Sequence, residues 1–292
     1  MTEVKTAPKK VKKESQFIAV CKRIATNPTA LVGFIILFII VMACALANIV
    51  APYDPTYMDY AHMLEAPSAA HIFGTDALGR DMFSRMLYGG RYSLSLGIIV
   101  SLIHAFTGVA LGSLVGYAGG QVDMVVMRII DVLSAIPGNL LTITMATIMD
   151  PGYISIMIAM VVTGLPGGLR GPRAMALKER NQEYLEAALS VNASKARIIF
   201  KHMVPNIIAP TIVGTTMGIG GTINQVAGLA FIGLGVQPPT PEWGSMVSDG
   251  RKYILNKPFL IIIPGLVIAA TVLSINLFGD GLRDALDPKL KK

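Results

Sequence analysis

Apolar residues occur along this chain in six long runs, separated by segments that hold most of the charged residues. A helix rises about 1.5 Å per residue, so about 20 apolar residues cross the hydrocarbon core of a bilayer. Strands and core helices of water-soluble domains have shorter apolar runs than these. The pattern predicts six transmembrane helices, at Leu31–Val50, Ser93–Tyr117, Val132–Met149, Pro151–Leu169, about Ile207 to Ile232, and Pro258–Gly279.

Prolines and glycines interrupt several of these runs. Membrane helices tolerate both residue types, because neighbouring helices satisfy the freed backbone groups. Pro166 and the glycines beside it are nevertheless expected to end the fourth span early.

The composition agrees with a membrane protein. Of the 292 residues, 53% are hydrophobic and 15% charged, against about 25% charged in an average soluble domain. The two cysteines, Cys21 and Cys44, cannot form a disulfide framework, and no CxxC or Cys/His cluster occurs. Soluble, disordered, collagen-like and disulfide-rich classes are therefore excluded, and the predicted fold is an all-α membrane protein.

The charged segments predict the orientation of the spans. If both termini are cytoplasmic, residues 1–30, 118–131, 170–206 and 280–292 lie inside and hold 19 of the 25 Lys and Arg residues. Residues 51–92 and 233–257 then lie outside and hold six. Positive charge is enriched in cytoplasmic loops, so both termini are expected in the cytoplasm. The formal net charge of +7 then follows from topology and needs no nucleic-acid partner.

The N-terminal region predicts a retained first span. Its apolar stretch of 20 residues exceeds the 7–15 residues of a signal-peptide core, which argues against cleavage. Just before it, Phe17, Val20, Cys21 and Ile24 recur at helical spacing beside basic residues, which predicts a short interfacial helix ended by Asn27-Pro28. We divide the chain into a basic tail and interfacial helix, residues 1–30, and a six-span domain, residues 31–292.

The connection from Arg170 to His202 is longer and more structured than a hairpin between two spans requires. Its basic residues alternate with short apolar patterns that favour helices. Such a connection could be an ordinary interfacial helix, or it could hold a moving partner. We call residues 170–206 the coupling loop, because the sequence within it favours the second interpretation.

Glu186-Ala187-Ala188, Asn192 and Pro205 resemble the EAA loop of ABC-importer permeases. In that pattern the position of Asn192 is glycine, and His202 and Val204 stand where Ile and Leu are usual. Glycine ends a short helix there in a left-handed turn, and asparagine is the next residue able to adopt that conformation. The resemblance implies that Glu186 is a polar anchor for an ATPase subunit, that Ala187 and Ala188 allow close contact, and that Asn192 ends the helix. Pro205 is either a hinge or a simple helix start.

A second block strengthens the resemblance. The segment Phe73–Arg91, with Ser93-Leu94 after it, is similar to the region that follows the first span in peptide- and nickel-type permeases. The chain departs from those permeases at Gly168, where they have Trp, and at Leu189, where many have Arg. Further matches are Leu165-Pro-Gly, Arg170, Arg173, Phe231–Gly235, Pro238-Pro239-Thr240, Trp243-Gly244 and Phe278–Pro288.

This resemblance to the binding-protein-dependent permeases of dipeptides, oligopeptides or nickel implies a set of partners. They are a second, homologous permease forming a heterodimer, two ATPase subunits, an extracytoplasmic substrate-binding protein and the lipid bilayer. ATP and Mg²⁺ would bind to the ATPase subunits, and this chain would bind no cofactor. The implied fold is that of a type I importer permease with a cytoplasmic coupling helix.

Catalytic motifs do not stand out. The chain lacks GxxxxGK[ST] and GxGxxG, and glycines such as those of Gly214–Gly221 lie in an apolar helix where they favour packing. The four histidines are not paired at metal-ligand spacing, so we expect no metal site. The chain is expected to be a non-catalytic subunit.

Polar residues within the predicted spans are candidates for a translocation path, because such groups usually face a bundle interior or a pathway. We select His104, Asn224 and Gln225; interhelical hydrogen bonding is the alternative role. Outside the spans, Asp76, Arg80, Asp81 and Arg85 have spacings that permit helical salt bridges. They are expected to brace an extracytoplasmic gate, or else to form a solvated, self-paired face.

The preferred function is an ATP-driven importer permease for di- or oligopeptides. Nickel or another small solute is the alternative within the class, although the lack of a histidine or thiolate cluster favours peptides. A secondary transporter driven by an ion gradient is the alternative outside it. That class predicts carboxylates within the spans or inverted repeats, and neither is evident in the sequence.

Overall fold

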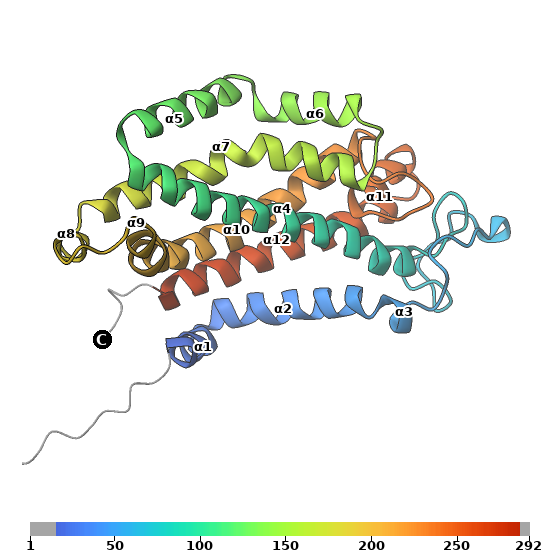
Figure 1. Cartoon of the computed structure of the whole chain (residues 1–292). Helices are drawn as coiled ribbons and strands as arrows, with labels where there is room; N and C mark the ends of the chain where they lie inside the picture. Colours follow the sequence, from blue (N-terminus) through green and yellow to red (C-terminus); the bar gives the residue numbers. More distant parts are fainter. Residues whose placement is uncertain (1–15, 287–292) are drawn as a thin grey trace, which may run out of the picture.

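The computed structural model describes residues 16–286, and the predicted basic tail and the last six residues lie outside that range. Within it the chain forms helices joined by loops (Figure 1). The helices are α1 Gln16–Thr26, α2 Pro28–Ala45, α3 Ala47–Val50, η1 Tyr60–His62, α4 Met82–Ala118, α5 Gly120–Ala135, α6 Gly138–Ile148, α7 Tyr153–Arg180, α8 Glu183–Ser190, α9 Lys195–Arg197, η2 Ile198–Met203, α10 Val204–Phe231, α11 Trp243–Gly250, η3 Arg251–Tyr253 and α12 Phe259–Leu286.

Six crossings of a membrane are compatible with this architecture. Among the described residues, five helical segments are each long and apolar enough to span a bilayer: α2, α4, α7, α9–α10 as one helix, and α12. The bent pair α5–α6 provides a sixth span if its two halves are counted together. The all-helical membrane fold predicted from the apolar runs is confirmed.

The two ends of the bundle carry different elements (Figure 1). One end, which we call the α8 end, holds α1, α8, α9 and the last described residues of α12. The other, the α11 end, holds the loops of residues 51–81 and 232–258. Within residues 16–286, the segments predicted to be cytoplasmic therefore gather at the α8 end, and those predicted to be extracytoplasmic gather at the α11 end.

The N-terminal helix follows the sequence prediction. Helix α1 ends at Thr26, and the Asn27 side chain accepts hydrogen bonds from the backbone of Thr29 and Ala30, so it caps α2. Pro28 occupies the first turn of α2, where a missing N–H costs nothing. The Arg23 guanidinium donates to the Ala285 carbonyl at 3.2 Å and ties α1 to the end of α12.

Helices α4 and α7 form the closest pair in the bundle because small residues line one face of α4. Gly108, Gly112 and Gly116 recur every four residues and lie against the backbone of α7. A Cβ at Gly108 would overlap the carbonyl oxygen of Gly168, and one at Gly112 would lie 2.8 Å from the Arg173 nitrogen. Such spacing permits close approach of membrane helices.

The third predicted span is not a straight helix. It is divided between α5 and α6, which meet at a bend of 78° around Ile136 and Pro137. Pro137 cannot donate a backbone hydrogen bond and disfavours helical geometry in the residue before it, so the helix ends there. Residues 118–131, predicted to be a loop, belong largely to helix α5.

The predicted early end of the fourth span at Pro166 is wrong. Helix α7 continues through Pro166 and Pro172 to Arg180. The carbonyl that loses its helical partner at Pro166 is that of Val162. The adjacent Val161 carbonyl accepts a hydrogen bond from His104 Nε2 of α4 at 3.0 Å, so a neighbouring helix packs against α7 at the interruption. Membrane helices tolerate proline where neighbouring helices cover the backbone in this way.

The coupling loop is consequently more helical than predicted. Residues 170–180 complete α7, and a continuous helix starts at Lys195 and runs to Phe231. What remains between the spans is the two-residue connection Asn181–Gln182, helix α8 and the four-residue turn 191–194.

Candidate functional site

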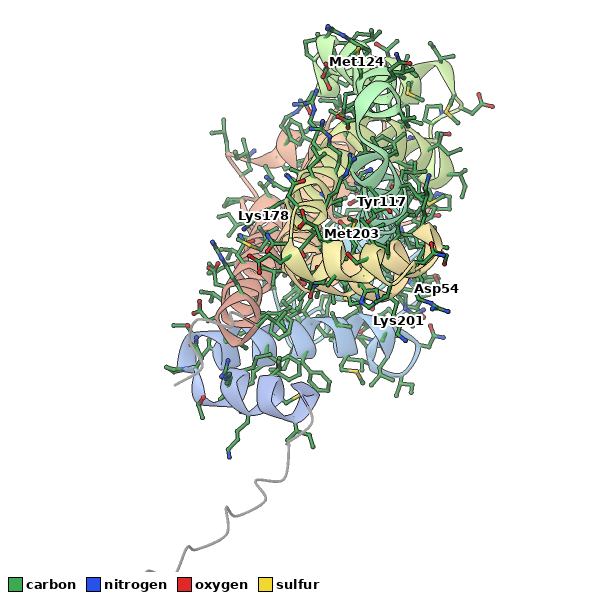
Figure 2. The ribbon with its side chains drawn as sticks, turned by 60° about the vertical axis from the view of Figure 1, so that its left-hand side comes forward. Asp54, Tyr117, Met124, Lys178, Lys201 and Met203 are labelled. Atoms are coloured by element: carbon green, nitrogen blue, oxygen red, sulfur yellow. The ribbon has the colours of Figure 1, made fainter. Side chains whose placement is uncertain are left out.

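Helix α8 lies at the end of the bundle and is fixed there by Leu185. This side chain is 1% exposed and packs in a cluster with Ala176 of α7, Ile198 and Met203 of η2 and Ile207 of α10. Figure 2 views this end, with Lys178, Met203 and Tyr117 near the centre of the face. Leu185 is the one fully buried residue of α8, so the helix is attached to the bundle by one side only.

The opposite side of α8 is free for a partner. Glu186 and Ala187 are exposed, and Ala188 is half-buried against the cluster around Leu185. The Glu186 carboxylate makes no hydrogen bond or ion pair within the described residues, so its oxygens remain able to accept charge-assisted bonds. Leu189 and Val191, 51% and 78% exposed, extend this surface with apolar area.

The turn after α8 is left-handed, as expected from Asn192 in the place of glycine. Asn192 has φ +59°, and the next amide, Ala193 N–H, donates to the Ala188 carbonyl at 3.1 Å. This pattern closes the helix C-terminus and reverses the chain toward α9. Asparagine therefore preserves the turn that glycine usually makes.

The φ of Asn192 predicts the effects of two substitutions. Asn192→Gly is expected to leave stability within a few tenths of a kcal/mol of wild type, because glycine adopts this region freely. Asn192→Val is expected to cost about 1–2 kcal/mol, because a branched side chain is strained there. Thermal unfolding of the detergent-purified variants measures both. Equal melting of the Gly and Val variants would contradict the assignment.

Pro205 lies in the first turn of α10, directly after the π-helical turn η2. Within η2 the hydrogen bonds skip an extra residue, as between Val204 N–H and the Ile199 carbonyl. The boundary predicted at Pro205 is therefore a change of helix type within one continuous helix. Single π turns are frequent at functional sites.

At the α11 end, the four residues predicted to brace a gate are all buried. Asp76 and Arg80 form an ion pair at 2.7 Å, and Arg85 Nε lies 3.4 Å from the same carboxylate. Asp81 caps α4 by accepting from Ser84 N–H. The exposed fractions of the four residues are 3–8%, so a solvated, self-paired face is wrong.

The spacing of these four residues suggested that they share one helix, but they do not. Asp76 and Arg80 lie in the turn before α4, where Gly79 has φ +72° and a Cβ would collide with the backbone of Asp59. Positive φ at Gly79 breaks the helical register. Arg85, on α4, also donates to the carbonyls of Pro55 and Pro239, at 2.9 and 3.4 Å. One guanidinium thus joins three segments that are distant in sequence.

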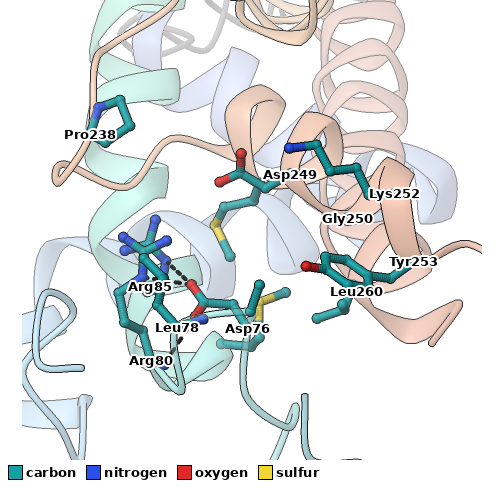
Figure 3. Close-up of a pocket in the computed structure, with 13 residues that line it drawn as sticks. Asp76, Leu78, Arg80, Arg85, Pro238, Asp249, Gly250, Lys252, Tyr253 and Leu260 are labelled. Atoms are coloured by element: carbon teal, nitrogen blue, oxygen red, sulfur yellow. Dashed lines mark hydrogen bonds and ion pairs between the residues drawn. The ribbon is translucent and has the colours of Figure 1, made fainter. Parts of the chain in front are cut away.

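A cavity of about 220 Å³ opens beside this cluster. Figure 3 shows Asp76, Arg80 and Arg85 on one side of it and Asp249 and Lys252 on the other. Burial raises the pKa of Asp249, while the nearby Arg85 and Arg80 lower it. The cavity wall therefore carries both signs of charge, and its floor is apolar.

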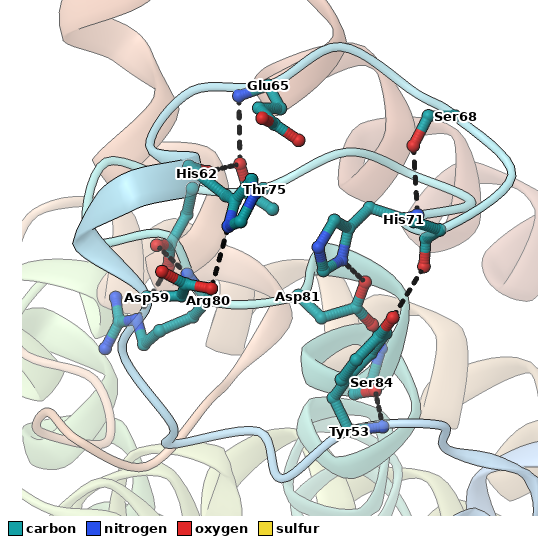
Figure 4. Close-up of polar contacts among 12 residues, drawn as sticks. Tyr53, Asp59, His62, Glu65, Ser68, His71, Thr75, Arg80, Asp81 and Ser84 are labelled. Atoms are coloured by element: carbon teal, nitrogen blue, oxygen red, sulfur yellow. Dashed lines mark hydrogen bonds and ion pairs between the residues drawn. The ribbon is translucent and has the colours of Figure 1, made fainter.

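The loop that precedes α4 is fixed by further polar contacts, drawn in Figure 4. Asp81, besides capping α4, bonds His71 Nδ1 at 2.9 Å. Asp59 bonds His62 Nδ1 at 2.8 Å, which raises the pKa of His62 and lowers that of Asp59. Thr75 Oγ1 accepts from Glu65 N–H and donates to the His62 carbonyl. These contacts give the loop a defined conformation although its only helix is the short η1.

Glu242 and Trp243 join α11 to α4. Both are fully buried; the Trp243 indole donates to the Met86 carbonyl at 2.9 Å. The Glu242 carboxylate accepts from Ser93 Oγ at 2.7 Å and from Ser245 N–H at 2.8 Å, capping α11. Burial raises the pKa of Glu242, and its hydrogen bonds partly offset this.

The raised pKa of Glu242 predicts a pH effect on stability. Its stabilising contribution is fully present below the ordinary glutamate pKa and is lost as pH rises through the raised value, because ionisation in the folded state is disfavoured. Glu242→Gln lacks this titration, so its melting temperature minus that of wild type should increase from pH 4.5 to 8. Thermal unfolding of both proteins across this range tests it, and a constant difference would disprove the assignment.

The three residues selected for a translocation path occupy different surroundings. His104 is half-buried between α4 and α7, packed on Gly164 and Gly168. Asn224 is exposed on α10, and Gln225 beside it donates to Asn139 Oδ1 of α6 at 3.4 Å. Gln225 thus reaches α6, whereas His104 lies within the contact between α4 and α7.

No three His, Cys, Asp or Glu side chains in residues 16–286 are grouped so that they could hold a metal ion.

Three residues that sequence reasoning did not select have clear structural roles. Glu242 is one, and the preference of N-caps for Ser, Thr, Asp and Asn gave no signal for a glutamate in that role. The others are Tyr184 and Asn206, whose side chains bond each other across 22 positions of sequence. A single sequence carries no signal for that pair.

Two family models match the chain. Residues 108–292 match the binding-protein-dependent transport system inner membrane component, and residues 15–67 match the N-terminal TM domain of oligopeptide transport permease C. Fold and matches together define a multi-pass membrane permease. The chain belongs to the family of binding-protein-dependent transport system inner membrane components.

Curated relatives resemble it over nearly their whole length. The dipeptide transport system permease protein DppC of Haemophilus influenzae is 41% identical over 272 residues, covering 91% of this chain and 92% of the relative. The di/tripeptide permease DppC of Pseudomonas aeruginosa is 41% identical, covering 91% and 90%. The glutathione permease GsiD of Pectobacterium atrosepticum is 44% identical over 260 residues, covering 89% and 86%.

Proposed function

We propose that this permease imports di- or oligopeptides, driven by two separate ATPase subunits, one of which docks on α8. The observation that carries the proposal is the geometry of α8. It is a short helix anchored by one buried leucine, presents Glu186 and Ala187 outward, and is closed by Asn192 in a left-handed turn. A movement imposed on such an element passes to α7 and α10 through connections of two and four residues.

The charge distribution supports a cytoplasmic position for α8 and for both termini. Of the 17 Lys and Arg residues within residues 16–286, 11 lie in the segments predicted to be cytoplasmic, which is the bias of such segments. The ATPases, with their ATP and Mg²⁺, would then meet α8 from the cytoplasm, and this chain would remain non-catalytic.

The α11 end would face the substrate-binding protein. Asp76, Arg80, Asp81 and Arg85 fix the turn before α4 to the loops of Pro55 and Pro239, which suits the bracing of an extracytoplasmic gate. The translocation path would form between this chain and a second, homologous permease. Asn224, exposed on α10, and Gln225, bonded to Asn139 of α6, are proposed to line it, together with His104.

Peptides are the proposed substrates because the relatives named above are permeases for dipeptides, di/tripeptides and glutathione, a peptide-like molecule. The rival solute is nickel. Transport of a metal ion usually draws on histidine or thiolate ligands, and residues 16–286 contain no such cluster.

The test is purification of the complex through a tag on this chain, from cells that express the second permease, the ATPases and the binding protein. Recovery of all partners and ATP hydrolysis stimulated by dipeptide-loaded binding protein would support the proposal. Stimulation by Ni²⁺ but not by dipeptides would overturn the substrate. A chain that is stable and transports alone, without ATPases, would overturn the mechanism.

A further inference from the structure

The phenol hydroxyl of Tyr184 joins three helices at the α8 end. Tyr184 lies in the first turn of α8 and donates to the carboxylate of Glu179, in the last turn of α7. The same hydroxyl accepts from Asn206 Nδ2, in the first turn of α10, at 2.8 Å. One side chain of α8 is therefore bonded to both flanking spans.

The direction of each hydrogen bond follows from the groups. An ionised carboxylate only accepts, so the phenol donates to Glu179 and accepts from the amide. Burial and the Glu179 carboxylate raise the pKa of Tyr184, so the hydroxyl keeps its proton at neutral pH. Asn206 Nδ2 also donates to the His202 carbonyl at 3.0 Å, which fixes its orientation.

These bonds complement the packing of Leu185. Leu185 holds α8 against the cluster of apolar side chains by contact, which resists separation but permits sliding. Directional hydrogen bonds from the adjacent residue resist sliding and rotation. Without them, α8 would keep only its apolar contact and its two short backbone connections.

We propose that Tyr184 is a positioning residue that makes α8, the end of α7 and the start of α10 move as one body. This inference rests on the proposed function, in which α8 receives the movement of an ATPase. It adds that the tightness of coupling, measured as peptide imported per ATP hydrolysed, depends on the contacts of one phenol with Glu179 and Asn206. The competing account is that the short connections alone transmit the movement.

The first test compares Tyr184→Phe with wild type in the complete importer reconstituted in proteoliposomes. The variant keeps the ring and loses both hydrogen bonds, so peptide imported per ATP is expected to fall about fivefold, the factor that corresponds to one net hydrogen bond. Glu179→Leu should lower the peptide imported per ATP to a similar extent. Glu179→Gln keeps a hydrogen-bond acceptor and should retain most of the peptide imported per ATP.

Tyr117→Phe is the matched control. Tyr117 is a half-buried tyrosine of α4 that packs on the same apolar cluster, and its hydroxyl makes no hydrogen bond within the described residues. A merely structural loss would lower the amount of assembled complex and leave peptide imported per ATP unchanged. An unchanged ratio in Tyr184→Phe would overturn the proposal.

A second readout does not depend on transport. Spin labels at Val191→Cys and Ile208→Cys, in a Cys21→Ser background, report the distance between the end of α8 and α10; both positions are exposed. The distance distribution should broaden in Tyr184→Phe and stay narrow in Tyr117→Phe. An unchanged distribution would also overturn the proposal. If peptide transport itself fails in wild type, the proposed function is wrong, and this measurement still decides whether Tyr184 positions α8.

Discussion

Glu186→Lys is expected to abolish transport while the permease still inserts and folds. The carboxylate is exposed on α8 and makes no contact within the described part of the chain, so its replacement disturbs nothing inside the bundle. At the proposed ATPase interface it removes an acceptor of charge-assisted hydrogen bonds and places a positive charge against their donors. Uptake of labelled dipeptide into cells should fall about 100-fold or more, the size of losing such a bond and gaining a repulsion.

Glu183→Lys provides the matched control. Glu183 is an exposed glutamate one turn earlier on the same helix. Its substitution by lysine makes the same change in charge at the same end of α8. Glu183 lies outside the EAA pattern, so uptake should remain near wild type. Immunoblots of membranes measure insertion for both variants. Normal uptake with Glu186→Lys, or equal loss with Glu183→Lys, would show that α8 does not dock through Glu186.

Gly108→Ala is expected to have the largest effect on folding. The new methyl group would meet the carbonyl oxygen of Gly168, a backbone atom that cannot rotate away, so α4 and α7 must separate. Overpacking of this kind costs about 3 kcal/mol, and at a close helix contact it removes packing along several turns. The measurement is the temperature at which the purified protein leaves its monodisperse peak in size-exclusion chromatography.

Gly171→Ala tests whether the contact, rather than the loss of a glycine, is responsible. Gly171 lies on α7 in the same region, and no atom approaches the position of its Cβ within 4 Å. Alanine favours helix over glycine by about 0.5–1 kcal/mol, so this variant should be equal to wild type or more stable. Destabilisation by both substitutions to the same extent would refute the role of the α4–α7 contact.

The fold could be read from the sequence to the extent that it depends on local composition. Apolar runs gave the membrane class and the approximate spans, and Asn27-Pro28 gave the boundary between α1 and α2, because capping is a local interaction. Asn192 was a similar case, since its φ follows from the turn it must make.

Prolines marked the limit of this reasoning. Pro166 was expected to end a helix and does not, whereas Pro137, inside a predicted span, produces a bend of 78°. At Pro166 a neighbouring helix covers the backbone, because His104 of α4 bonds the adjacent Val161 carbonyl. Such a partner is 57 residues away in sequence, so no local pattern could reveal it.

In the candidate site, too, local motifs could be read from the sequence, whereas contacts between distant segments could not. Glu186, Ala187 and Ala188 were identified by a contiguous motif, and the structure places them together on α8. The arrangement of Asp76 and Arg85 was misjudged, because Gly79 reverses the chain between them. Tyr184, Glu242 and Asn206 were missed because their roles arise from tertiary contacts between segments far apart in sequence.

The bend between α5 and α6 has a consequence for the surrounding lipid. Helix α6 has 11 residues, so it is only about 16 Å long, and the bend lies opposite Thr163 and Pro166, near the middle of α7. The first N–H groups of α6 receive no side-chain cap there. Acyl chains cannot accept hydrogen bonds from them, so where this bend lies within the hydrocarbon region we expect another polypeptide or water, rather than lipid, to cover it. The lipid shell around the permease is then an incomplete ring.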